Sequence, residues 1–193
     1  MKRKIMNNVY INIALLCSLL MGANNSFAAK IDYIQLGKDI TSQEQELVFQ
    51  QFSNDDALSL GLFMIEKAKK EGKAITIDIN RNGQQLFHYA LTGTAPENDI
   101  WIERKNEVTR RSNRSSLAMW YWQEEGWMKD DFHMSYIEMW GLDPQQAMNL
   151  GGAFPLTIKD VGVVGTITVS GLAHNKDHAF VVDALSDYLN SKS

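Results

Sequence analysis

The stretch that decides the fold is GGAFPLTIKDVGVVGTITVSGLAHNKDHAFVVDALSDYL, which spans residues 151–189. After a Gly-Gly pair, Leu156–Ile158 and the β-branched run Val161–Ser170 flank a Lys-Asp turn, and this pattern predicts two paired strands. Apolar residues then recur at helical spacing over Asn175–Leu189, which predicts a closing amphipathic helix. Paired strands followed by a covering helix are typical of an α+β domain.

A second hairpin is predicted upstream of this stretch. Ala74–Ile79 alternates apolar and polar residues, an Asn-Gly pair marks the turn, and Leu86–Ala90 forms the returning strand. Because both strand pairs are hairpins, we expect an antiparallel sheet covered by helices.

Helices are expected in the remaining segments. Ser53 and Asp56 have capping-box spacing, so a helix should begin there and end at Glu71-Gly72. The expected inward face of this helix is Leu58, Leu62, Ile65 and Ala68. Further helical segments are expected over Thr41–Phe52, Asn98–Glu124 and part of Asp130–Trp140.

The N-terminus has the layout of a secretory signal peptide. Three basic residues precede an apolar run that is too short to span a membrane, and a small-x-small sequence ends at Ala28. We therefore expect residues 1–28 to be removed and residues 29–193 to form one periplasmic or secreted domain, with no membrane attachment afterwards.

The composition of the remaining chain excludes several kinds of protein. Removal of residues 1–28 takes away Cys17, the only cysteine, so no disulfide or thiol nucleophile would remain. It leaves 16 basic against 23 acidic residues, a net charge of −7 that argues against a nucleic-acid partner. No Gly-x-Ser-x-Gly motif is present, and we assign no catalytic residue.

Several motifs together resemble the haem-degrading-domain superfamily, which includes GlcG-like proteins, HbpS and the C-terminal domain of PduO. They are Gly151-Gly152-x-Phe154-Pro155-Leu156, the run Val163–Leu172, and Asp177-His178. The segment Trp101-Ile102-x-Arg104-Lys105-Asn106-x-Val108 narrows the resemblance to the UPF0303 subgroup, over about residues 40–190.

The resemblance implies a profilin-like, GlcG/HbpS-like fold: a five-stranded antiparallel sheet flanked by helices, usually in homo-oligomers. It also implies binding of haem or another tetrapyrrole as a cofactor. The chain departs from the subgroup in two respects. It carries a predicted export signal, whereas most members are cytosolic, and Leu150 stands where a histidine commonly precedes the Gly-Gly pair.

The basic segment around Trp101 is the first candidate ligand site. Trp101, Arg104 and Lys105 fall on one face of the expected helix. A flat ring beside two cations suits a planar anionic molecule such as haem, whose propionates would meet Arg104 and Lys105. The alternatives are an oligomer contact or ion pairs with the neighbouring glutamates.

Other candidate residues each have a structural alternative. His88, near a strand end, could ligate haem iron, although a hydrogen-bonded role is more common for such a histidine. Gly151 and Gly152 could let the backbone approach a ligand, or they could form a tight turn before a strand.

A metal site is a weaker hypothesis near the last helix. His174, Asp177 and His178 stand at i, i+3 and i+4, a spacing that a divalent metal can use. Asn175 is the expected helix cap, and Asp177 in the first turn would complement the helix dipole, so structural roles are favoured.

Residues 119–140 have the densest group of aromatic and methionine side chains. Such a group could pack in the core, line an apolar pocket or form an oligomer seam. Its members are Trp120, Tyr121, Trp122, Trp127, Tyr136 and Trp140, with Met119, Met128, Met134 and Met139.

These observations favour an exported module that binds haem, another tetrapyrrole or a similar small ligand. The alternatives are a haem-degrading enzyme and a non-catalytic oligomeric interaction protein.

Overall fold

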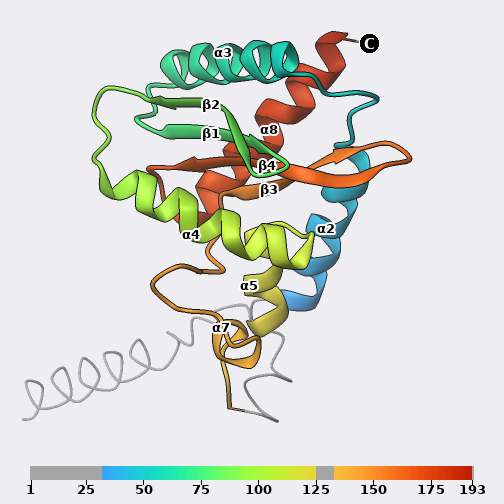
Figure 1. Ribbon diagram of the computed structural model, residues 1–193, viewed down its shortest axis with the longest axis vertical. Coiled ribbons are helices and arrows are strands. Elements are labelled where there is room, and N and C mark those ends of the chain that lie inside the picture. Colours follow the sequence, from blue (N-terminus) through green and yellow to red (C-terminus); the bar gives the residue numbers. More distant parts are fainter. Residues whose placement is uncertain (1–31, 125–132, 193) are drawn as a thin grey trace, which may run out of the picture. The chain divides into compact units, whose positions relative to one another are not determined.

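The computed structural model describes residues 32–124 and 133–192. The predicted signal peptide, Trp127 and Met128 lie outside the described residues. The elements in chain order are α2 (Tyr33–Glu46), α3 (Asn54–Lys70), β1 (Thr76–Arg81), β2 (Gln84–Ala90), α4 (Glu97–Ser112), α5 (Ser116–Glu124), α7 (Tyr136–Met139), β3 (Ala153–Ile158), β4 (Gly162–Ser170) and α8 (His174–Lys192) (Figure 1). None of the helices among the described residues has the length and apolar content needed to cross a membrane.

The sheet confirms the expected antiparallel α+β architecture. Its strands are ordered β2-β1-β4-β3, and every neighbouring pair is antiparallel. Asn82 and Gly83 both have positive φ angles, 52° and 82°, as the predicted Asn-Gly turn requires. The described residues form four strands, so the fifth strand implied by the resemblance is not confirmed, and beside β3 Phe49 adds a single parallel bridge to Ile158.

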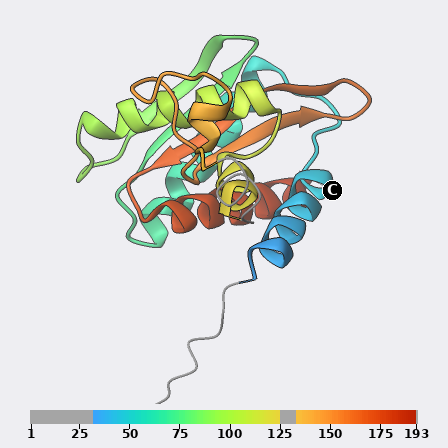
Figure 2. The same cartoon turned by 90° about the horizontal axis from the view of Figure 1, so that it is seen from below.

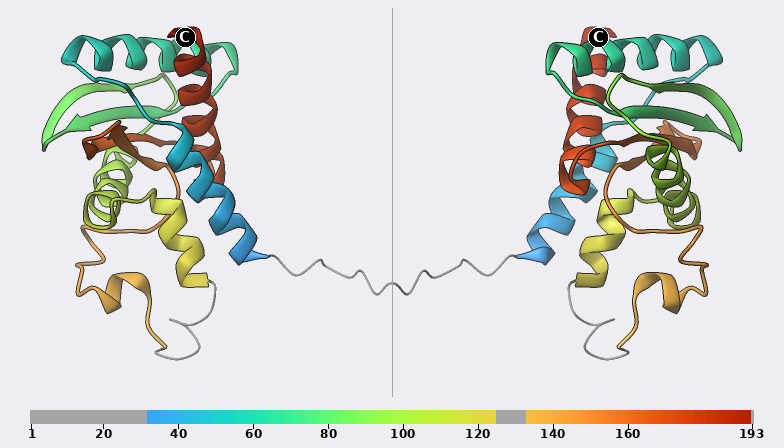
Figure 3. Two further views of the ribbon diagram at one scale, coloured as in Figure 1. Left: turned by 90° about the vertical axis from the view of Figure 1, so that its right-hand side faces the viewer. Right: turned by 90° about the vertical axis from the view of Figure 1, so that its left-hand side faces the viewer.

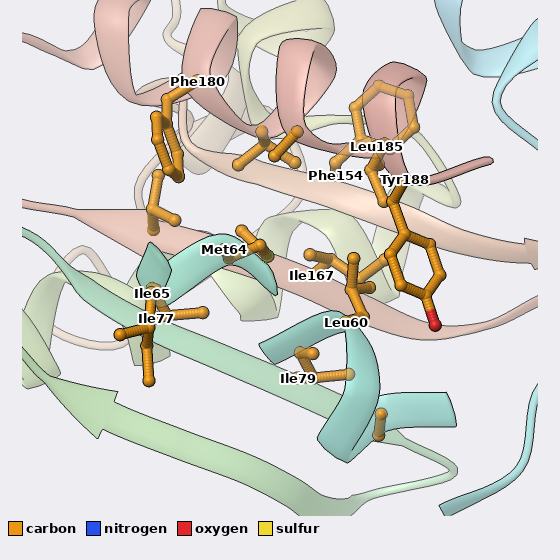
Figure 4. Close-up of a cluster of buried hydrophobic side chains, with 14 of the residues drawn as sticks. Leu60, Met64, Ile65, Ile77, Ile79, Phe154, Ile167, Phe180, Leu185 and Tyr188 are labelled. Atoms are coloured by element: carbon orange, nitrogen blue, oxygen red, sulfur yellow. The ribbon is translucent and has the colours of Figure 1, made fainter. Parts of the chain in front are cut away.

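The core lies between one face of the sheet and the helices α3 and α8. Leu60 and Met64 from α3, Ile77 from β1, and Phe180 and Leu185 from α8 are all fully or almost fully buried there. Figure 4 shows these side chains converging from the two helices and the strands.

The inward face predicted for α3 was half wrong. The Ser53–Asp56 capping box is present, so the helix begins where the sequence predicts. However, Leu58 and Leu62 are each 51% exposed, because Gly61 is the position that faces the sheet. A Cβ atom at Gly61 would lie 2.5 Å from the ring of Phe87, so the glycine lets the helix approach the strands closely.

The opposite face of the sheet carries polar side chains. Helix α4 covers this face, and its yellow-green ribbon lies against the strands in Figure 3. Thr76 and Asp78 on β1 lie opposite Ser170 and Thr168 on β4, and all four are at least 97% buried. When polar and apolar residues alternate along a strand, the polar face of the sheet is usually exposed to solvent. In this protein α4 buries it, and the sheet therefore carries a second internal layer made of polar side chains.

The single helix expected over Asn98–Glu124 is two helices. Asn113 ends α4 with a left-handed φ of 56°, and α5 begins at Ser116. Asn tolerates this conformation better than most residues, so the chain can turn there. The expected N-terminal helix also differs, since α2 runs from Tyr33 to Glu46 rather than from Thr41 to Phe52. Figure 2 shows α4 from below, with α5 beside it.

Candidate functional site

One cavity among the described residues is about 820 Å³ in volume and is bordered by α2, α4, α5 and α7. We term it the aromatic cavity, after its rings Trp122, Tyr136 and Trp140. Its charged lining residues are Lys38, Arg111 and Arg114, and no Asp or Glu belongs to its described lining. The cavity therefore combines flat apolar walls with positive charge.

The aromatic walls are packed against one another. The Tyr136 ring centroid lies 6.2 Å from that of Trp122 and 6.3 Å from that of Trp140. Tyr136 is 3% exposed, and its burial raises the pKa of its phenol. Trp140, by contrast, is 59% exposed. Of the uses considered for the aromatic group, the structure supports a pocket lining for these three rings.

The two arginines of the aromatic cavity are held in place by neighbouring side chains. Arg114 donates from Nη2 to Thr41 Oγ1 at 2.8 Å and from Nε to Glu44 Oε2 at 2.5 Å. Arg111 donates from Nε to Glu107 Oε1 at 2.8 Å. These bonds fix where the two guanidinium groups lie and leave their other N–H groups for a ligand.

The second cavity, about 650 Å³, opens from the polar layer of the sheet and is termed the polar cavity. Its walls include Asp78, His88, Asp99, Arg104 and Asn106. They come from β1, β2, the start of α4 and the middle of α4.

Asp78 is at the centre of a hydrogen-bond network in the polar cavity. Its Oδ1 accepts from Gln85 Nε2 at 2.6 Å, and its Oδ2 accepts from Asn106 Nδ2 at 3.2 Å. Thr168 in turn donates from Oγ1 to Asn106 Oδ1 at 2.5 Å. His88 lies between two carboxylates, with Nδ1 3.3 Å from Asp78 Oδ1 and Nε2 3.3 Å from Asp99 Oδ1. The network orders a set of polar side chains that faces an open volume.

Two of the residues predicted for the ligand site, His88 and Arg104, therefore share one cavity. Trp101 lies beside it, with its ring centroid 4.5 Å from the Arg104 guanidinium carbon. Arg104 also donates from Nη2 to the Pro144 carbonyl at 2.7 Å. Trp101 and Arg104 stack as expected, but the Arg104 guanidinium also has a hydrogen-bond partner within the protein.

Lys105 does not share the face of Trp101 and Arg104, and this part of the prediction was wrong. Its side chain is 4% exposed, and its Nζ donates to Asp177 Oδ2 at 2.8 Å and to the Val169 carbonyl at 3.2 Å. Burial lowers the Lys105 pKa, an effect that the neighbouring Asp177 opposes. Because α4 lies on the sheet, the side chain that was predicted to lie on the ligand-binding face points inward.

Gly152 leaves space for this ion pair, and Gly151 leaves space for the start of α8. Gly152 has a φ of 132°, and a Cβ atom there would lie 2.7 Å from Lys105 Nζ and 2.5 Å from the Val169 carbonyl. A Cβ atom at Gly151 would lie 2.5 Å from the His174 carbonyl. The structural alternative considered for both glycines therefore accounts for them.

The residues of the weaker metal hypothesis have separate partners. Asp177 binds Lys105 and accepts from the Leu172 amide at 2.9 Å, while the His178 Nε2 lies 3.0 Å from Gln43 Oε1. His174 Nδ1 accepts from the Gly151 amide at 3.4 Å. Within residues 32–124 and 133–192, no three histidine, cysteine or acidic side chains are grouped so as to hold a metal ion. The last helix begins at His174 itself, not after a cap at Asn175.

The residues at the centre of the polar cavity were not predicted from the sequence. Asp78 was not singled out, because polar residues alternating along a strand usually face solvent. Asp99 and Asn106 lie on α4, and their positions on the helix did not show that they face the sheet. Thr76–Asn80 and Thr166–Ser170 both have a polar residue at every second position, and the two strands pair. This shared pattern could have indicated a continuous polar face on the sheet.

Comparison with known proteins gave consistent matches. A family model described as "Haem degrading protein HbpS-like" matches residues 52–186. A UPF0303 protein of Streptomyces coelicolor is 43% identical over 152 residues, covering 78% of this chain and 92% of that protein. A UPF0303 protein of Edwardsiella ictaluri is 39% identical over 151 residues, covering 78% and 92%.

Solved structures share the fold. The crystal structure of the Ybr137w protein has a TM-score of 0.70 and 27% identity, covering 81% of this chain and 88% of that one. A PduOC:haem complex has a TM-score of 0.56 at 14% identity, covering 70% of this chain and 93% of that one. Crystalline HbpS has a TM-score of 0.54 at 19% identity, covering 72% and 90%.

Proposed function

Because this chain belongs to the HbpS-like family of haem-degrading proteins, in its UPF0303 branch, we propose that it binds haem or a related tetrapyrrole in the aromatic cavity. The observation that carries the proposal is a ring-walled cavity bordered by three cations, with no Asp or Glu in its described lining. One structural neighbour was crystallised with haem, which favours the same class of ligand.

The size and chemistry of the aromatic cavity suit such a molecule. Its volume of about 820 Å³ lies within the range of about 300–1,000 Å³ that is typical of cofactor pockets. Trp122 and Trp140 offer faces for a planar ring system, and Arg111 and Lys38 offer N–H donors for its carboxylates. Anionic groups would meet positive charge there even though the whole chain has a net negative charge.

The lining also bears on how the iron of a haem would be held. Met119 and Tyr136 are the described lining residues that could ligate it. Burial raises the Tyr136 pKa and so disfavours a phenolate, which leaves the Met119 thioether as the better candidate. His88 belongs to the polar cavity, so its predicted ligation would need a different binding place. Bound haem would itself supply the redox chemistry of any degradation.

Haemin titration followed at the Soret band tests the proposal. Trp140→Ala and Arg111→Glu change exposed side chains, so they should leave the fold intact and weaken binding about tenfold or more, as expected for lost contacts to a charged group. Arg104→Glu is the control in the polar cavity and should bind haemin like the unchanged protein. Absence of saturable binding, or loss of binding only in Arg104→Glu, would reject the aromatic cavity.

Haem degradation is the second candidate, because the matched family description names it. Incubation of the haemin-loaded protein with a reductant, with and without oxygen, distinguishes degradation from binding. Bleaching of the Soret band that requires both oxygen and the protein would support an enzyme.

We further propose that the protein acts outside the cytosol as a homo-oligomer, after removal of residues 1–28. The support is the tripartite N-terminal sequence and the family resemblance. Native mass spectrometry of material from the periplasm would report the mature mass and the assembly size, and an intact N-terminus would contradict export.

A further inference from the structure

The polar cavity differs from the aromatic cavity in charge and in chemistry. Its lining includes four carboxylates, from Asp78, Asp99, Glu103 and Glu107, against two guanidinium groups. The aromatic cavity has three cations and no carboxylate in its described lining. The two cavities therefore suit ligands of opposite charge.

Both guanidinium groups of the polar cavity already have partners. Arg110 donates from Nη2 to Glu107 Oε2 at 2.6 Å. Arg104 bonds the Pro144 carbonyl and lies over the Trp101 ring. Arg104 keeps its positive charge, because its partners are a neutral carbonyl and a ring, but the carboxylates of Asp78, Asp99 and Glu103 outnumber it. An anion entering here would be repelled, and a cation would be attracted.

Two buried polar atoms on the cavity walls have no hydrogen-bond partner among the described residues. One is Asp99 Oδ1, an acceptor that lies 3.3 Å from His88 Nε2 without a hydrogen bond to it. The other is Arg104 Nε, a donor. Buried polar atoms are normally satisfied, so Asp99 and Arg104 have hydrogen-bonding capacity that no described residue uses.

We infer that the polar cavity binds a small hydrophilic amine that also carries a hydroxyl group, as amino sugars and amino alcohols do. The ammonium group donates to Asp99 and lies near Asp78, and the hydroxyl oxygen accepts from Arg104. The amides of Gln85 and Asn106 hold Asp78 in place, so the negative wall is present before the ligand arrives. This site is independent of haem binding in the aromatic cavity.

Isothermal titration calorimetry of the full-length purified protein, with three sugars that differ in charge, tests the inference. Glucosamine is cationic, glucose is neutral and glucuronate is anionic, and ethanolamine serves as the smallest amino alcohol. We expect saturable binding of glucosamine or ethanolamine, and affinities for glucose and glucuronate at least tenfold weaker than for glucosamine. Preference for glucuronate, or no saturable binding of either amine, overturns the inference.

Matched variants locate the binding. Asp99→Asn keeps the shape of a side chain that is 50% exposed, so the fold should be retained, and it should weaken amine binding about tenfold, equivalent to about 1.4 kcal/mol. Glu66→Gln removes an exposed carboxylate on α3, which packs on the other face of the sheet, and should leave the affinity unchanged. Equal effects of the two variants, or no effect of Asp99→Asn, place binding elsewhere and overturn the inference. Trp140→Ala should weaken haemin binding and leave amine binding intact, which separates the failure of one proposal from that of the other.

Discussion

Replacement of His178 by glutamine should remove much of the acid sensitivity of the fold. His178 is 4% exposed on α8, and its neutral ring donates from Nε2 to Gln43 Oε1 across 3.0 Å. Its Nδ1 is buried and has no hydrogen-bond partner among the described residues. Protonation of this nitrogen would create a buried charge with no acceptor, and burial accordingly lowers the His178 pKa from 6.5 to about 4.

The sign and size of the effect follow from this difference. The folded pKa lies below the unfolded value, so the unfolded state binds more protons between about pH 4 and pH 6.5, and stability falls as the pH falls through this range. Proton linkage gives a loss of about 2 kcal/mol at pH 5 and about 3 kcal/mol below pH 4 from this group alone.

Urea unfolding at pH 8 and pH 5 measures the effect. The loss of unfolding free energy between the two pH values should be about 2 kcal/mol smaller in His178→Gln than in the unchanged protein. His174→Gln is the matched control on the same helix, since His174 is only half-buried and should account for less of the loss. If His178→Gln loses as much stability as the unchanged protein, the buried neutral ring is not the cause.

Two further substitutions test the packing around α4. Lys105→Met should lower the free energy of unfolding by about 3–5 kcal/mol in urea titrations, because Asp177 is left buried without its partner. The double variant Lys105→Met/Asp177→Leu should recover part of this loss, and a double variant at least as unstable as the single one would contradict the argument. Gly152→Ala should lower the free energy of unfolding by at least about 1–3 kcal/mol in the same titrations. The φ of 132° is strained for any residue with a Cβ atom, and the Val169 carbonyl would lie too close to that atom. Unchanged stability would show that the turn can relax.

Much of the local structure was predictable from the sequence. The Asn-Gly turn, the strands on either side of it and the Ser53 capping box are present as expected, because a turn or a cap depends on a few neighbouring residues. The closing helix and its buried Phe180 and Leu185 also follow the sequence pattern. Prediction was weaker where the chain changes direction without a glycine or proline, as at Asn113, where one expected helix became two.

The candidate site was only partly predictable. His88 and Arg104 were identified from residue type and meet in one cavity, whereas Lys105 was assigned to the wrong side of its helix. Asp78 was passed over, although it is the most connected side chain of the polar cavity.

The sequence by itself determined the hairpins, the capped helices, the antiparallel α+β class and the family. Only the tertiary structure decided that the polar face of the sheet is buried. It also decided that cations line the aromatic cavity and that most charged residues of the polar cavity are carboxylates. The physical reason is that polar and apolar residues alternating along a strand point to opposite faces of the sheet, and this pattern does not indicate what covers either face. A polar face looks the same in sequence whether water or a helix lies on it, and the packing of α4 settles which one it meets.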